Sequence, residues 1–265
     1  MPLTPFQEQL ARLLAPQRSL DSHLAGDAAL HRVPNSKRYS NDLDYFHDSV
    51  ERVAKAFEED RAVLLKEGYD VAIQMNQPGY IRAIVSKGDG VTKVEWSHDT
   101  AWRFMPTIKV DGIGYQLHPV DLAINKLLAL VGRDEPRDFI DILYVHDTVL
   151  PLGALVWAAV GKDPGFTPNS LLELLKRRGK YRADDFKRLQ LTEEVDLVAM
   201  KTHWLEALAD AEKFIRLQPP EELGCLYYSK KKEGFVAPDR AKKEKDQDVV
   251  PHFGRPGGLL PKVMD

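Results

Sequence analysis

The sequence of 265 residues contains a single cysteine, Cys225, so an intramolecular disulfide is excluded and a cytoplasmic setting is expected. The histidines follow no zinc-ligand spacing, which argues against a structural zinc site. The N-terminus lacks a basic region followed by an apolar run, so we expect no secretory signal. The longest apolar stretch, residues 149–160, contains Pro151 and Gly153 and is too short to cross a bilayer. We therefore expect a soluble protein without membrane contact.

A large excess of one charge sign is also missing. Charged residues make up 29% of the chain, yet the formal net charge is only -3. This balance gives no support for a general nucleic-acid-binding surface and leaves room only for a local basic patch. One basic stretch lies near the C-terminus, at Lys230, Lys231, Lys232, Arg240, Lys242, Lys243 and Lys245. Acidic residues are interspersed with it, so an RNA-backbone contact and a solvated tail both stay open.

The apolar content, 43% of the residues, is enough for one substantial core or for a core with a smaller helical lobe. Within residues 1–118, the apolar patterns predict a strand, a long helix and three more strands, at residues 42–46, 49–66, 69–75, 80–87 and 91–96. Glycine and proline between the last three strands predict an antiparallel meander. This order is typical of an α+β domain with a mixed or antiparallel sheet.

The rest of the chain is predicted to be mainly helical. Residues 119–218 are expected to form a helical C-terminal lobe that completes a cleft with the first domain. After Pro219 and Pro220 the composition changes, and residues 219–265 are rich in charge, proline and glycine. We expect an extended or flexible tail there, apart from a short strand at residues 223–228.

Asp42 and Asp44 are the first candidates for chemistry. Side chains of a strand alternate between its faces, so both carboxylates project from one face while Leu43 points into the core. Neighbouring carboxylates repel each other, and a divalent cation offsets that cost. Mg²⁺ prefers oxygen ligands and is commonly shared between carboxylates and the phosphates of a substrate. The alternative is an acidic pair in a solvated loop.

Two further segments suit an anionic substrate. Gly26 lies among small residues, where a glycine lets backbone N–H groups approach an anion; an ordinary strand-to-helix turn is the alternative. Lys126 lies in a strongly apolar helical segment, from which its ammonium reaches either the solvent or a triphosphate. Arg137 and Asp141 are four residues apart, a spacing that also fits a simple intrahelical ion pair.

Taken in order, these segments resemble a known family. Residues 26–30 are similar to its Gly-Gly-Thr-Ala-Leu turn, and residues 38–44 follow its Arg-x-Ser-x-Asp-hydrophobic-Asp pattern. A lysine helix then precedes residues 133–141, which follow its Arg-x-x-x-Arg-Asp-x-x-Asp pattern. Residues 20–145 therefore resemble the nucleotidyltransferases of the AbiEii abortive-infection toxin group, part of the DNA-polymerase-β-like superfamily.

The resemblance implies a polymerase-β-like nucleotidyltransferase domain that moves a nucleoside monophosphate from an NTP to an acceptor and releases pyrophosphate. The implied acceptor is an RNA, for example a tRNA, or a protein. The toxin of a toxin–antitoxin pair is the implied biological role, with an antitoxin protein as partner. Mg²⁺ is the implied cofactor.

The resemblance also implies roles for individual residues. Asp42 and Asp44 are expected to bind the metal, and Glu95 is our candidate for a third metal carboxylate, with an exposed strand residue as the alternative. Catalytic roles are expected at Asp42, Asp44, Lys126, Asp138 and Asp141. Nucleotide contacts are expected at Gly26, Asp27, Arg38, Ser40, Lys126, Arg133 and Arg137.

Asp27 departs from the family pattern, which has a neutral residue at this place in the turn. Its carboxylate adds negative charge beside the expected phosphates, or else reaches a metal. This departure keeps a catalytically weak nucleotide- or partner-binding protein open as an alternative. A metal-dependent phosphohydrolase that uses the same acidic pair is a third hypothesis.

Overall fold

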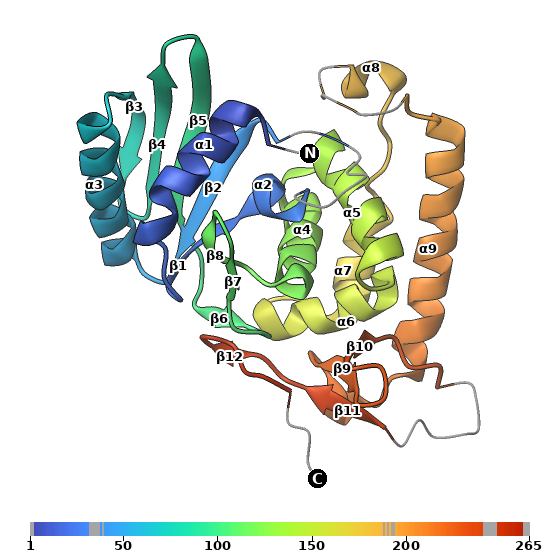
Figure 1. Cartoon of the computed structure of the whole chain (residues 1–265). Helices are drawn as coiled ribbons and strands as arrows, with labels where there is room; N and C mark the ends of the chain where they lie inside the picture. Colours follow the sequence, from blue (N-terminus) through green and yellow to red (C-terminus); the bar gives the residue numbers. More distant parts are fainter. Residues whose placement is uncertain are drawn as a thin grey trace. The chain divides into compact units, whose positions relative to one another are not determined.

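The computed structural model describes residues 3–31, 38, 40–187, 189, 191, 194–240 and 248–261. The chain divides into two compact units. The first is built from Met1–His118 with two short later segments, Gln190–Thr192 and Pro256–Gly258, and the second from most of the remaining residues. Figure 1 shows the helices and strands of both.

The first unit is organised around a seven-stranded sheet with the order β3-β4-β5-β2-β1-β8-β7. The strands are β1 (Ser22–Ala25), β2 (Asp42–His47), β3 (Asp70–Gln77), β4 (Tyr80–Lys87), β5 (Gly90–His98), β7 (Ile108–Val110) and β8 (Gly114–Gln116). β3, β4 and β5 form the predicted antiparallel meander, while β2 runs parallel to β5 and antiparallel to β1. The sheet is therefore mixed, and the predicted α+β class is confirmed.

Helices and short elements complete the first unit: α1 (Pro5–Leu14), the 3-10 helix η1 (Ala15–Gln17), α2 (Gly26–Leu30), α3 (Val50–Lys66) and β6 (Trp102–Arg103), which pairs with β12 (Arg255–Pro256). Ser49 begins α3 by accepting a hydrogen bond from the Arg52 N–H. α3 covers the sheet face that carries Tyr45 and Trp96, and the Phe57 and Trp96 rings lie 5.1 Å apart. Residues that alternate with these two project from the opposite face.

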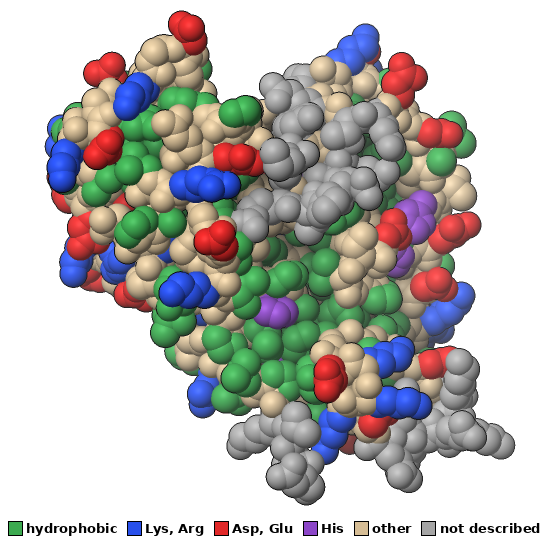
Figure 2. Space-filling view, in the orientation of Figure 1, with side chains coloured by type: hydrophobic (Ala, Val, Ile, Leu, Met, Phe, Trp, Pro, Cys, Tyr) green, Lys and Arg blue, Asp and Glu red, His purple; other side chains and the backbone are tan. Residues whose placement is uncertain are grey.

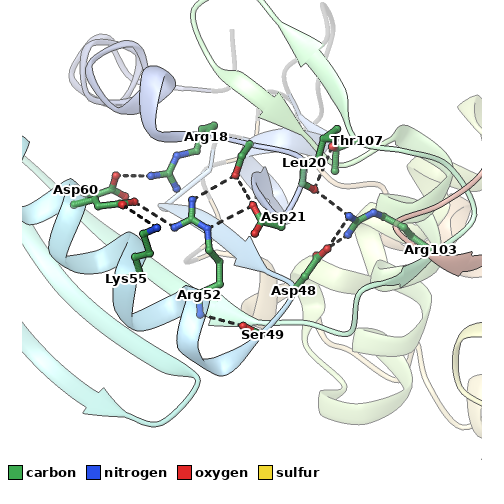
Figure 3. A network of polar contacts seen from close by, with 12 residues as sticks. Arg18, Leu20, Asp21, Asp48, Ser49, Arg52, Lys55, Asp60, Arg103 and Thr107 are labelled. Carbon is green, nitrogen blue, oxygen red and sulfur yellow. Dashed lines mark hydrogen bonds and ion pairs between the residues drawn. The ribbon is translucent and has the colours of Figure 1, made fainter.

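A polar network ties the ends of β1, β2 and α3 together (Figure 3). Arg103 donates to both oxygens of Asp48, at 2.7 and 2.9 Å, and to the Leu20 carbonyl oxygen at 3.0 Å. Beneath the sheet, Asp60 is paired with Arg18 and accepts a hydrogen bond from the Trp96 indole at 2.7 Å. These contacts fix β2 from its buried side, so side chains on its other face stand on a rigid support.

In the second unit, the described residues between 119 and 218 are mainly helical. This unit contains α4 (Pro119–Arg133), α5 (Pro136–Thr148), α6 (Leu152–Lys162), α7 (Pro168–Leu175), α8 (Ala183–Phe186), α9 (Leu197–Leu217) and the 3-10 helix η2 (Pro220–Glu222). α6 is apolar and buried from Leu152 to Val160 because α4, α7 and α9 all pack against it. Among the described residues, no single helix is long and apolar enough to cross a membrane, and α5 and α6 pass only as a pair bent by 111°.

The segment after residue 219 corrects the prediction of an extended or flexible tail. Its described residues form a three-stranded antiparallel sheet of β9 (Leu226–Ser229), β10 (Gly234–Val236) and β11 (Val249–His252), with β9 in the middle. Leu226 and Tyr227 are buried, and the Trp157 indole donates to the Glu222 carbonyl oxygen at 2.9 Å. A few buried apolar residues thus fold a segment whose average composition is polar.

Candidate functional site

Asp42 and Asp44 lie on one face of β2, as predicted, with Leu43 fully buried between them. In the parallel pairing of β2 with β5, Asp42 is opposite Lys93 and Asp44 is opposite Glu95. Paired residues of neighbouring strands project from the same face, so the three acidic side chains lie on the face that α3 does not cover. We call Asp42, Asp44 and Glu95 the carboxylate face.

Gly26 lies directly against the carboxylate face. It follows Ala25, which pairs with Asp44, and it has a positive φ of 61° that L side chains rarely adopt. A Cβ atom at this position would overlap Asp44 Oδ2 and lie 2.7 Å from its Cγ. The glycine is thus required both by the backbone conformation and by the closeness of Asp44.

Two basic residues that the sequence analysis did not select neutralise part of the carboxylate face. Lys93 Nζ lies 2.7 Å from Asp42 Oδ2 and 2.9 Å from Glu95 Oε1, and Arg82 Nε donates to the same Glu95 oxygen at 2.9 Å. Burial raises the pKa of Glu95, but hydrogen bonds and charges from Lys93, Tyr80 and Arg82 outweigh it and hold the pKa below the ordinary value. The Lys93–Glu95 spacing of two residues on a strand is the sequence signal for this contact.

The carboxylate face fits a divalent metal ion on two counts. Asp42 is only 3% exposed, and its Oδ1 atom has no hydrogen-bond partner among the described residues, although buried carboxylate oxygens are normally paired. Three carboxylates at adjacent strand positions also provide the oxygen ligands that Mg²⁺ prefers. An ion ligated there would supply positive charge against substrate phosphates.

The other nucleotide-binding candidates of the first unit, Asp27, Arg38 and Ser40, are buried. Asp27 forms an ion pair with Arg38, at 2.5 Å between the carboxylate and the guanidinium, and both side chains are almost fully buried. Ser40 Oγ donates to the Asp42 carbonyl oxygen at 2.8 Å, which fixes the start of β2. The negative charge of Asp27 is thus offset within the protein.

The remaining candidates belong to the second unit. Lys126 of α4 lies 3.3 Å from Asp138 and 2.9 Å from Asp141, both on α5. Arg133 donates twice to Asp138, at 2.6 and 2.8 Å. Both aspartates are fully buried and Lys126 is 6% exposed, so its ammonium is directed at these carboxylates rather than at solvent. We call Lys126, Asp138 and Asp141 the buried charge cluster; Arg133, whose side chain is 47% exposed, pairs with it from the surface, and Arg137 lies in the first turn of α5.

The charges of the cluster act on Asp138. Burial raises the pKa of Asp138, but hydrogen bonds from Arg133 and the charge of Lys126 lower it by more. The pKa of Asp138 therefore lies below its ordinary value. Asp138 is therefore ionised at neutral pH and is a weak base. This favours a positioning role for Asp138 over proton transfer.

His146, Asp147 and His203 are a further set of residues of metal-binding types that lie close together. His203 Nε2 lies 2.8 Å from Asp147 Oδ1, while His146 Nδ1 accepts a hydrogen bond from the Leu152 N–H at 2.9 Å. That bond leaves the proton of a neutral His146 on Nε2, the atom that faces the group. His146 therefore accepts a hydrogen bond at the start of α6 and is poorly suited to ligate a metal ion.

The surface charges match the composition. Figure 2 shows basic and acidic side chains interspersed over the described part of this face, rather than separated into large areas of one sign. Acceptor recognition by a broad basic surface therefore finds no support on this face.

Comparisons with known proteins identify the fold of the chain. No family model matches the sequence, and no curated protein matches it. Among solved structures, MenT4, a nucleotidyltransferase toxin from Mycobacterium tuberculosis, is similar over 78% of this chain and 81% of its own, with 18% identity and a TM-score of 0.52. An H. pylori protein described as a candidate nucleotidyltransferase is similar over 80% and 96%, with 17% identity and a TM-score of 0.50. The chain therefore has the nucleotidyltransferase fold that the sequence resemblance implied.

Proposed function

We propose that this chain is a Mg²⁺-dependent nucleotidyltransferase that moves a nucleoside monophosphate from an NTP to an RNA, such as a tRNA, or to a protein. The observation that carries the proposal is the carboxylate face: Asp42, Asp44 and Glu95 in register on β2 and β5, with Gly26 against Asp44. The similarity to MenT4 supports a further part of the proposal, that the protein acts as a toxin with an antitoxin partner in the cytoplasm.

In this reaction a hydroxyl oxygen of the acceptor attacks the α-phosphorus of the NTP, and the hydroxyl proton passes to solvent water or to Asp141. The new phosphoester bond forms as the bond to the bridging oxygen of the β-phosphate breaks, and pyrophosphate leaves with its electron pair. The role of Asp42, Asp44 and Glu95 is to hold the metal that neutralises the developing charge. Positioning and charge neutralisation supply most of the rate in such a site.

Further roles belong to residues that supply cations or bases. We propose triphosphate contacts for Lys126, Arg133 and Arg137, and a supporting or basic role toward the acceptor for Asp141. Lys126 and Arg133 are charged, and both already bind carboxylate oxygens in the fold. The Gly26 turn, with Asp27, Arg38 and Ser40, is proposed to shape the nucleotide pocket.

The proposal is tested by incubating the purified chain with Mg²⁺, total RNA and each NTP labelled at the α-phosphate. We expect the label on RNA or on protein with wild type and its loss with Asp44→Asn, which keeps the shape of the side chain but removes a charge. Asp70→Asn is the matched control, because Asp70 begins the exposed edge strand β3. Absence of label from every acceptor with every NTP would contradict the proposal.

The same assay separates the alternatives. Binding of NTP without transfer favours the catalytically weak binding protein, for which the Asp27–Arg38 ion pair is the relevant observation because it engages two nucleotide-binding candidates. Release of labelled nucleotide and inorganic phosphate without a labelled acceptor favours the phosphohydrolase.

A further inference from the structure

Lys93 contacts two of the three proposed metal ligands at once. Its ammonium lies 2.7 Å from Asp42 and 2.9 Å from Glu95. We propose that Lys93 is a resident counter-ion of the carboxylate face, which a divalent metal ion must displace in order to bind. This inference rests on the metal site of the proposed function and adds a residue that sets the affinity of that site.

The two cations compete for the same oxygen ligands. Mg²⁺ requires carboxylate oxygens at about 2.0–2.1 Å and tolerates little distortion. An ammonium bonded to Asp42 Oδ2 and Glu95 Oε1 occupies lone pairs that the ion needs, and it repels the ion through its own charge. The Lys93 ammonium and a Mg²⁺ ion therefore cannot bind Asp42 and Glu95 at the same time.

The Lys93 ammonium can move away from Asp42 and Glu95 at little cost. Its side chain is 30% exposed and ends a flexible four-carbon stem, so the ammonium can move into solvent without being buried elsewhere. Glu95 keeps a second partner in Arg82, whereas Asp42 Oδ1 is buried and has no hydrogen-bond partner among the described residues, so it remains as a ligand for a metal ion. Departure of Lys93 thus leaves Asp42 in need of a cation, which the metal supplies.

A structural bridge is the competing explanation, and it predicts the opposite effect. If Lys93 mainly held Asp42 and Glu95 in position for the metal, its removal would weaken metal binding. If Lys93 is a competitor, its removal strengthens metal binding, because the apparent affinity for the metal is proportional to the fraction of time that the site is free of Lys93. The sign of the change separates the two explanations.

The test is a Mn²⁺ titration, followed by the electron paramagnetic resonance signal of the free ion, on the full chain without nucleotide. For Lys93→Met we expect a Kd about tenfold lower than for wild type, which corresponds to Lys93 blocking the site about 90% of the time. Lys93→Arg, which keeps the charge, is expected to bind like wild type. Lys87→Met is the control, because Lys87 binds the Glu67 carbonyl oxygen away from the carboxylate face.

Thermal unfolding gives a readout that does not depend on free-ion detection. We expect Lys93→Met to unfold at a lower temperature than wild type without metal and to gain more from saturating Mn²⁺; Lys93→Gln repeats the measurement with a polar side chain. Equal or weaker Mn²⁺ binding by both variants would overturn the inference while leaving the metal site intact. If neither wild type nor the variants bind Mn²⁺, either alone or with a non-hydrolysable NTP analogue, the metal site itself is refuted, and the proposed function with it.

Discussion

The carboxylate face and the buried charge cluster contain the same chemistry in different surroundings. Each combines aspartates with a lysine, but Lys93 is 30% exposed whereas Lys126 is 6% exposed, and Asp138 and Asp141 are fully buried. The carboxylate face also has a buried oxygen, Asp42 Oδ1, without a hydrogen-bond partner among the described residues. One arrangement is open to exchange of its cation, and the other is locked.

This difference indicates different contributions to stability and activity. A buried ion pair is costly to break because the remaining charge stays in a medium of low polarity, whereas an exposed pair contributes little. We therefore expect changes in the buried charge cluster to act first on folding. Changes on the carboxylate face are expected to act first on metal binding and transfer.

The largest effect is expected from Asp44→Asn. Loss of one metal carboxylate should lower the transfer rate on the order of 10³-fold, because the charge that stabilises the transition state is no longer held in place. The unfolding temperature should change by only a few degrees. The rate is measured with labelled NTP and the stability by thermal unfolding; a variant that unfolds while its folded fraction stays active would reverse the comparison.

Lys126→Met tests the buried charge cluster. Removal of Lys126 leaves Asp141 buried without its lysine partner, so we expect a loss of about 3–5 kcal/mol in the free energy of unfolding. Lys93→Met is the matched control, since the same substitution at a half-exposed lysine should cost less than about 1 kcal/mol. Urea unfolding measures both, and equal losses would mean that burial does not distinguish the two groups.

Gly26→Ala sharpens the comparison on the carboxylate face. The methyl group would collide with Asp44, so we expect a transfer rate lower by about 10²-fold, the scale of a misplaced reacting group. Gly68→Ala provides the control: Gly68 also has a positive φ, of 77°, but no atom within 4 Å of an added Cβ. Both variants should lose about 1–2 kcal/mol of stability from backbone strain. Gly26→Ala should lose more because of the overlap with Asp44, and only Gly26→Ala should lose activity.

The smallest effect concerns acid. The pKa of Asp138 is lowered in the fold from its ordinary value of 3.8, so the unfolded state binds its proton first as the pH falls. Its stabilising contribution is complete above about pH 3.8 and is lost as the pH falls through the lower pKa of the folded state. Urea unfolding between pH 5 and pH 2 should show a shallower dependence of stability on pH for Asp138→Asn than for wild type; an unchanged slope would refute the assignment.

Much of the fold could be predicted because its long elements carry clear patterns. β2, α3 and the β3-β4-β5 meander follow apolar periodicity and turn residues, and the alternation around Leu43 places Asp42 and Asp44 on one face. β1, β7 and β8 have only three or four residues, too few for a pattern, and β1 meets β8 through the pairing of Leu24 with Gln116. Pairing so distant in sequence cannot be read from local periodicity.

The candidate site shows the same division. Motif order identified the aspartates, but the contact of Lys93 with Asp42 depends on the register of two parallel strands about fifty residues apart. The sequence also left Lys126 between solvent and a substrate, and its actual partners became evident only when α4 and α5 were packed. Register and burial are tertiary properties, so the sequence selected residues without establishing their environments.

The most direct test of the central claim is calorimetric titration of Mn²⁺ into the chain in the presence of a non-hydrolysable NTP analogue. The account predicts saturable binding by wild type, loss of that binding in Asp44→Asn, and wild-type binding in Asp70→Asn. Equal binding by wild type and Asp44→Asn would contradict it, because the carboxylates of β2 would then not be the metal ligands.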